Sequence, residues 1–147
     1  MPWKRIVLKQ KMEHILASSG KVKFAYLFGS QAKGSPGPLS DIDIAVFFDE
    51  TEYNQGNAFE DENELMFKLE KTLAPERVDL VVLNKAPVFL RHQILKNGEL
   101  ILCRADKERI RFHEATMRLY LDFQPFRSVQ NYYWKSEFVK VRSGGEP

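Results

Sequence analysis

GSQAKGSPGPLSDID, residues 29–43, lies between two short apolar runs, VKFAYLF at 22–28 and IAVFF at 44–48. Both runs are rich in aromatic and β-branched residues, which favour β-strands. The glycine, serine and proline residues between them are typical of a loop. The sequence therefore predicts a strand, a turn with a loop, and a second strand that opens at two aspartates.

These two aspartates, Asp41 and Asp43, are expected to act together. Side chains alternate between the faces of a strand, so both carboxylates should project from one face, with their Cα atoms roughly 6–7 Å apart. Aspartate is depleted in strands, and two carboxylates about 4 Å apart repel each other by on the order of 4 kcal/mol at an effective dielectric near 20. The pair therefore requires a cation. Oxygen-only ligation suits Mg²⁺, which keeps waters and takes further ligands from phosphates, and this predicts a metal–nucleotide site.

A third aspartate lies in another apolar run, VDLVVL at 78–83, which predicts a third strand. If the second and third strands are neighbours, Asp41, Asp43 and Asp79 face one cleft. Two Mg²⁺ ions roughly 3.5–4 Å apart, held by such carboxylates, suit nucleotidyl transfer, with Asp79 helping to deprotonate the acceptor hydroxyl. The plainer alternative is that Asp41 and Asp43 are turn residues and Asp79 is a surface residue. The combination in one strand–loop–strand context favours a catalytic role for all three.

The turn after the first strand is the expected phosphate-binding element. Gly29 would let the backbone approach a phosphate closely, because glycine has no side chain. Ser30 begins a short helical turn, 30–33, and can offer both its amide and its hydroxyl to a phosphate oxygen. Lys33 would add positive charge.

The rest of the chain alternates helices and strands, which predicts a small mixed sheet with flanking helices, an α+β (mixed α/β) fold. The expected elements are a helix over about 4–19, a surface loop over Thr51–Gly56, an amphipathic helix with Phe59, Met66, Leu69 and Leu73 as its apolar positions, a short helix over 87–96, an edge strand over 99–104, and a long helix with Asp106 as its N-cap. The predicted division is a core domain over 1–104, a C-terminal helical extension over 105–142 that packs on the core or on a partner, and a disordered tail over 143–147. Six aromatic residues from Phe123 onward are compatible with either kind of packing.

Composition narrows the class of protein. Over 147 residues, 44% are hydrophobic and 29% charged, which is ordinary for a globular protein. The formal net charge of +2 is too small to argue for nucleic-acid binding by electrostatics alone. No apolar window is long enough to span a membrane, and the N-terminus lacks the apolar core of a signal peptide, so we expect a cytoplasmic protein.

Gly29-Ser30, ten intervening residues and then Asp41-x-Asp43, with Asp79 as a third carboxylate, resembles the signature of the polymerase-β-like nucleotidyltransferases. The small size resembles the minimal nucleotidyltransferases, especially the MntA-like antitoxins paired with HEPN-domain toxins. The stretches ILKNGELI at 94–101 and YLDFQPF at 120–126 are similar to that subgroup. The resemblance covers about residues 5–126. Gln31 stands where family members often have arginine, which leaves open how the phosphates are held.

The resemblance implies a polymerase-β-like fold with a long C-terminal helix, ATP as substrate and two Mg²⁺ ions. It also implies transfer of AMP to a tyrosine hydroxyl of a cognate HEPN ribonuclease, in a hetero-oligomer with that toxin. A size argument agrees, because so small a domain leaves little chain for a second pocket, and a partner could bring its own hydroxyl. Two alternatives stay open: another acceptor, such as tRNA or a small-molecule alcohol, and a non-catalytic antitoxin that acts by occlusion.

Overall fold

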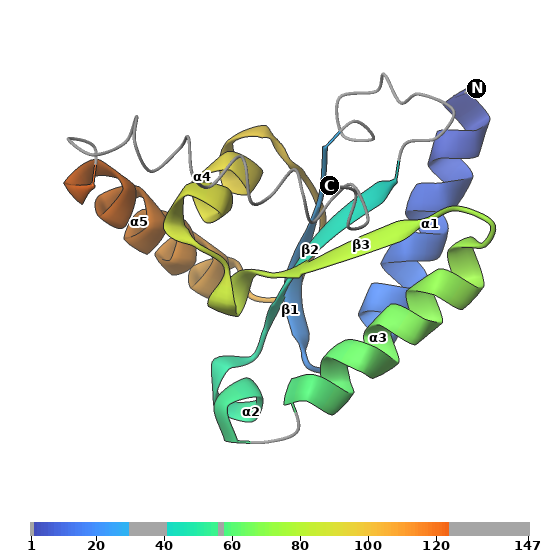
Figure 1. Ribbon diagram of the computed structural model, residues 1–147, viewed down its shortest axis with the longest axis horizontal. Helices are drawn as coiled ribbons and strands as arrows, with labels where there is room; N and C mark the ends of the chain where they lie inside the picture. Colours follow the sequence, from blue (N-terminus) through green and yellow to red (C-terminus); the bar gives the residue numbers. More distant parts are fainter. Residues whose placement is uncertain (1, 30–40, 56–57, 124–147) are drawn as a thin grey trace, which may run out of the picture.

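The computed structural model describes residues 2–29, 41–55 and 58–123 (Figure 1). Its elements in chain order are α1 (Pro2–Ser18), β1 (Val22–Phe28), β2 (Ile42–Phe48), α2 (Glu50–Gln55), α3 (Ala58–Leu73), β3 (Val78–Val82), the short 3-10 helix η1 (Leu83–Lys85), α4 (Val88–Asn97), β4 (Glu99–Cys103) and α5 (Asp106–Asp122). Within these ranges, no helix combines the length and the apolar composition needed to cross a bilayer.

The four strands form one sheet in the order β3-β2-β1-β4. β1 is antiparallel to both of its neighbours, whereas β2 and β3 are parallel. A parallel pair needs a crossover connection, and α2 and α3 lie within that connection (Figure 1). The predicted α+β fold with a small mixed sheet is therefore confirmed. The second and third strands are neighbours, which is the condition under which Asp41, Asp43 and Asp79 were expected to face one cleft.

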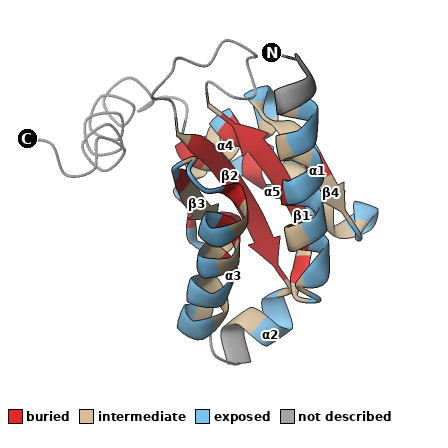
Figure 2. Cartoon of the chain, turned by 90° about the vertical axis from the view of Figure 1, so that its right-hand side faces the viewer, coloured by how far each residue is buried: buried red, intermediate tan, exposed pale blue. Residues whose placement is uncertain are grey.

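Helices cover both faces of the sheet, and the strand alternation assigns each side chain to one of two cores. Ile42, Ile44 and Val46 of β2 pack in one core with α1 and α3. Ala45 and Phe47 pack in the other, with η1, α4 and α5. Every residue of β2 is buried, and Figure 2 shows β1 and β2 as the buried centre of the fold.

The prediction of a loop over Thr51–Gly56 was wrong, because residues 50–55 form α2. Asp49 caps this helix: its Oδ1 accepts a hydrogen bond of 3.1 Å from the Glu52 amide, which also lowers the pKa of Asp49. The Tyr53 ring stacks on Phe48 with 5.8 Å between centroids. A cap and one aromatic contact thus order a segment whose composition is polar throughout.

The apolar face of α3 differs in part from the one predicted. In α3 the buried residues are Leu65, Leu69 and Leu73, whereas Phe59 is 77% exposed. The buried stripe therefore starts later than the sequence pattern predicted, since Phe59 lies in the first turn, away from the sheet.

At the start of α5, Ala105 rather than Asp106 occupies the N-cap position. Asp106 lies inside the first turn, where a negative charge stabilises the helix dipole. Its Oδ1 accepts a hydrogen bond of 3.2 Å from the Cys103 thiol. The carboxylate is thus directed toward the end of β4 and does not cap the helix.

The turn between α4 and β4 is expected to tolerate no side chain at Gly98. A Cβ there would lie 2.5 Å from the Ile94 carbonyl oxygen and 3.3 Å from that of Leu27, and backbone atoms cannot move aside cheaply. We predict that Gly98→Ala lowers the free energy of unfolding by about 1–3 kcal/mol in urea titrations. Gly20→Ala is the matched control, because nothing lies within 4 Å of its Cβ position, and it should leave stability unchanged or slightly raised. Equal unfolding midpoints for the two variants would contradict this packing.

Candidate active site

Two of the predicted acidic residues lie side by side. Asp43 of β2 and Asp79 of β3 are register partners in the parallel pair, so their Cα atoms are about 4.8 Å apart and their side chains share a face. That face also carries Ala45 and Phe47 and is the one covered by α4 and α5. Asp43 is 1% exposed, and Asp79 is half-buried. A carboxylate so deeply buried on a central strand is expensive unless neighbouring groups compensate its charge.

Asp41 lies directly before β2, two residues ahead of Asp43, and so belongs to the same side of the extended chain. Its side chain is 13% exposed, and its Oδ1 lies 3.7 Å from Nε of Arg77. The Ile42 amide donates a hydrogen bond of 2.7 Å to the Arg77 carbonyl, which fixes the beginning of β2 against that of β3. The structure therefore places all three aspartates at one end of the sheet, on one face.

Arg77 is a residue of this site that the sequence analysis missed. It precedes Asp79 by two residues, so the same alternation that grouped Asp41 with Asp43 could have placed it beside the acidic side chains. Its side chain is 76% exposed, in contrast to the nearly buried carboxylate that it contacts. The guanidinium therefore lies at the rim of the acidic group.

Gly29 completes the described part of the site. It follows the last residue of β1, Phe28, which is the register partner of Asp43. Its φ of 73° lies in the left-handed region, which glycine adopts without strain. The chain therefore turns sharply next to the aspartates, where a close approach of backbone was expected. Ser30 and Lys33 lie outside the described residues.

The donor set is made of carboxylate oxygens, which suit Mg²⁺. Within the described residues, no group of three Asp, Glu, His or Cys side chains is close enough to hold one ion alone. That arrangement fits the usual mode of Mg²⁺, which takes one or two carboxylates and completes its shell with waters and substrate phosphates. The residues present are thus compatible with a metal–nucleotide complex, and less so with a metal site made of protein ligands only.

Residues 10–107 match the profile of the family described as polymerase beta, nucleotidyltransferase. The chain belongs to this nucleotidyltransferase family. The matched segment runs from α1 to the beginning of α5 and contains Gly29 and all three aspartates. The nucleotidyltransferase fold expected from the sequence is therefore confirmed, whereas the roles of individual residues stay predictions.

This nucleotidyltransferase is similar to individual proteins and to chains in solved structures. A protein of Methanocaldococcus jannaschii with the provisional name protein adenylyltransferase MJ0435 is 35% identical over 95 residues, which span 65% of this chain and 95% of the relative. A chain in a crystal structure of a toxin–antitoxin with AMP-PNP is 29% identical, with a TM-score of 0.68 and coverage of 86% of this chain and 98% of that one. A chain in a structure of a tri-AMPylated Shewanella oneidensis HEPN toxin in complex with MNT antitoxin is 26% identical, with a TM-score of 0.65 and coverage of 89% and 98%.

The contact between Arg77 and Asp41 is expected to contribute little to folding. The arginine is 76% exposed and the contact is long, at 3.7 Å, so Arg77→Gln should change the free energy of unfolding by less than about 0.5 kcal/mol in urea titrations. Arg77→Lys, which keeps the charge, serves as the matched control. A decrease in the free energy of unfolding of about 3 kcal/mol or more, as expected when a buried ion pair is broken, would show instead that Arg77 stabilises the fold.

Proposed function

We propose that this chain is a Mg²⁺-dependent adenylyltransferase and antitoxin, which transfers AMP from ATP to a tyrosine hydroxyl of a cognate HEPN-domain ribonuclease toxin and so neutralises it. The observation that carries the proposal is the register pairing of Asp43 with Asp79, with Asp41 on the same side and the Gly29 turn beside them. The similarity to a chain in a complex with a tri-AMPylated HEPN toxin supports the acceptor class. The similarity to a chain in a structure with AMP-PNP supports the nucleotide.

The proposed transfer needs two tasks from the aspartates: to hold the metal and to accept the proton of the acceptor hydroxyl. Asp41 and Asp43 would hold Mg²⁺, which when bound would supply positive charge to neutralise the triphosphate and the pyrophosphate that leaves. Asp79, next to Asp43, contributes to metal binding and accepts the proton of the attacking hydroxyl. The tyrosine oxygen then forms a bond to the α-phosphorus, the bond from that phosphorus to the β-phosphate oxygen breaks, and pyrophosphate leaves.

Positive charge for the phosphates is proposed to come from the rim of the site. Gly29 allows the backbone to approach a phosphate, and Ser30 and Lys33 are proposed as further phosphate-binding residues. Arg77 already lies 3.7 Å from Asp41, and it can turn toward an incoming triphosphate because its side chain is largely exposed. The edge of the sheet thus offers carboxylates for the metal ions and basic side chains for the phosphates of the nucleotide.

The partner is proposed to supply the acceptor and to bind the C-terminal helical extension, 105–142. Within α5 and directly after it, several large apolar side chains are exposed, which supports a surface that another protein covers. These side chains, with their exposed fractions, are Ile110 at 46%, Leu119 at 38%, Leu121 at 56% and Phe123 at 41%. A hetero-oligomer with the toxin, in the cytoplasm, follows from this proposal.

Co-expression of this chain with its toxin should add AMP to the toxin, read as the intact mass of the purified toxin and the modified residue in a peptide digest. The double variant Asp41→Asn/Asp43→Asn should reduce transfer by at least about 10²-fold, because it removes the charge that holds the metal ions. Glu64→Gln is the matched control, since that carboxylate is 66% exposed and lies on α3, outside the aspartate site and outside the extension proposed to bind the toxin. Full neutralisation by the double variant, with the toxin mass unchanged, would instead support occlusion, and AMP on tRNA or a small alcohol would support the other acceptors.

Nucleotide binding should depend on the metal independently of any acceptor. AMP-PNP at 100 times its dissociation constant should stabilise the folded chain by about 2.7 kcal/mol in the presence of Mg²⁺, and by much less in EDTA. The Asp41→Asn/Asp43→Asn variant should lose this metal-dependent part of the stabilisation, measured by thermal unfolding. Equal stabilisation with and without Mg²⁺ would contradict the proposed role of the two carboxylates.

A further inference from the structure

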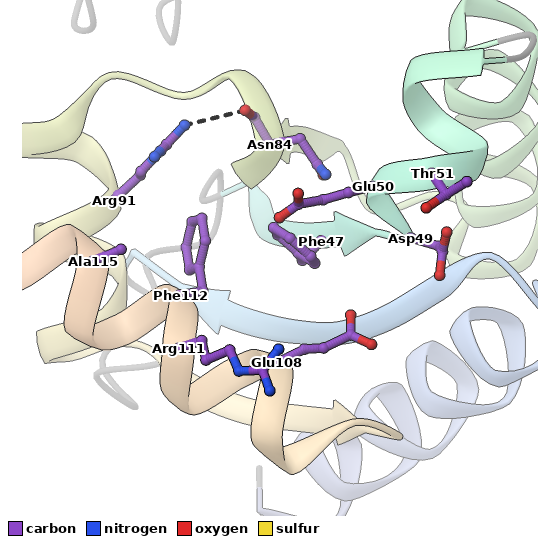
Figure 3. Close-up of a pocket in the computed structure, with 10 residues that line it drawn as sticks. All are labelled: Phe47, Asp49, Glu50, Thr51, Asn84, Arg91, Glu108, Arg111, Phe112 and Ala115. Atoms are coloured by element: carbon purple, nitrogen blue, oxygen red, sulfur yellow. Dashed lines mark hydrogen bonds between the residues drawn. The ribbon is translucent and has the colours of Figure 1, made fainter.

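A cavity of about 590 Å³ lies at the other end of β2 from the aspartates (Figure 3). It is bounded by the end of β2, the start of α2, η1, α4 and α5. Phe47, which lines it, is four residues from Asp43 on the same strand, a separation of about 13 Å. Its volume is within the range of about 300–1,000 Å³ that is typical of small-molecule sites. This cavity is therefore separate from the acidic group and is not explained by nucleotidyl transfer.

The wall of the cavity on α4 carries a half-buried guanidinium, that of Arg91. One of its terminal nitrogens, Nη2, donates a hydrogen bond of 3.1 Å to the Asn84 carbonyl, and its Cζ lies 5.1 Å from the centroid of the Phe112 ring (Figure 3). Its Nε is buried and, within the part of the chain that the structure describes, has no hydrogen-bond partner. Burial lowers the pKa of Arg91, because water solvates its charge less well in the half-buried position.

Arg91 is also held in place before any ligand arrives. The Asn84 side chain accepts a hydrogen bond of 2.9 Å from the Phe48 amide and donates one of 3.0 Å to the Phe48 carbonyl. This double contact ties η1 to the end of β2, and the Asn84 carbonyl in turn holds Arg91. Only one of the five N–H groups of the guanidinium is used in this contact, so terminal N–H groups remain to pair with a carboxylate in a fixed orientation.

The lining also carries carboxylates, which limits the ligands that fit. Glu50 and Glu108 both line the cavity, as does a second guanidinium, that of Arg111, on α5 (Figure 3). The charge of Glu50 acts on Arg91 and raises its pKa, against the effect of burial. Asp49 lines it too, but its carboxylate already accepts the Glu52 amide and lies 3.5 Å from Lys23. A purely anionic ligand at Arg91 would be repelled by the two glutamates, and a purely cationic one would be repelled by Arg91 and Arg111.

We propose that this cavity binds a small zwitterion, whose carboxylate pairs with Arg91 and whose ammonium group faces Glu50 and Glu108. The apolar stem between the two charges lies over Phe47 and Phe112, whose rings adjoin with 4.9 Å between centroids. Both ends of such a ligand gain charge-assisted hydrogen bonds, and the stem covers apolar surface. This proposal does not depend on the adenylyltransferase activity.

The test uses three probes of similar length: 6-aminohexanoate, which carries both charges, hexanoate, which carries only the carboxylate, and hexylamine, which carries only the ammonium. The readout is the NMR signal of the Arg91 Nε–H group, assigned by its absence in Arg91→Gln. Titration with 6-aminohexanoate should shift this signal to saturation, and each single-charge probe should bind about tenfold or more weakly, because it loses a charge-assisted hydrogen bond. Hexanoate or hexylamine binding as tightly as 6-aminohexanoate would overturn the proposal, as would the lack of a saturable shift.

Variants of residues inside and outside the cavity test whether 6-aminohexanoate binds there. Arg91→Gln should weaken 6-aminohexanoate about tenfold or more, measured by calorimetry, whereas Arg118→Gln, an exposed arginine of α5 outside the cavity lining, should bind as the unaltered chain does. Glu108→Gln keeps the proposal falsifiable if Arg91→Gln fails to fold. It should weaken 6-aminohexanoate and leave hexanoate binding equal or stronger. Unchanged affinity of the Glu108→Gln variant for 6-aminohexanoate would contradict the assigned position of the ammonium group.

Discussion

The parallel pairing of β2 with β3 is the constraint on which the rest of the structure depends. In this register Ile42 pairs with Val78 and Asp43 pairs with Asp79. The same register therefore places apolar side chains together on one face of the sheet and two carboxylates together on the other. A shift of one residue would turn Asp79 to the opposite face and would place Leu80 beside Asp43. At the beginning of the two strands, the Ile42 amide donates a hydrogen bond to the Arg77 carbonyl, which fixes this register. Folding and the geometry of the acidic group are thus set by the same hydrogen bonds.

The burial of β2 explains how a small protein can keep the Asp43 side chain almost fully buried. β2 is buried along its whole length, with helices on both sides, and its apolar residues supply packing to both cores. The free energy gained there offsets the cost of keeping Asp43 at 1% exposure. The acidic group lies at the end of the strand, where the Gly29 turn and the exposed Arg77 meet it. A fully buried strand therefore fixes the position of the acidic group at its end.

The sequence was sufficient for those parts of the fold that depend on alternation. The strands and the shared side of Asp41 and Asp43 follow from a period of two residues, and the alternation of strands with helices predicts the mixed sheet. That Asp79 shares this face required β2 and β3 to be neighbours, which the structure shows. It was insufficient where a few specific contacts stabilise a segment. Residues 50–55 are mostly polar and form a helix that Asp49 caps and in which Tyr53 stacks on Phe48, and neither contact can be read from a periodicity. The cavity around Arg91 was not foreseen either, because its lining comes from elements far apart in the sequence and becomes a site only when they pack together.

The central claim is that Asp41, Asp43 and Asp79 jointly hold a metal-bound nucleotide at the edge of the sheet. The most direct measurement is a crystal structure with AMP-PNP and Mn²⁺ in place of Mg²⁺, with the metal located by anomalous scattering. The account predicts anomalous peaks at bonding distance, about 2.0–2.2 Å, from the carboxylates of Asp41, Asp43 and Asp79, with the triphosphate against the Gly29 turn. Metal bound by the phosphates alone, or Asp79 turned to the face that packs on α1 and α3, would contradict it.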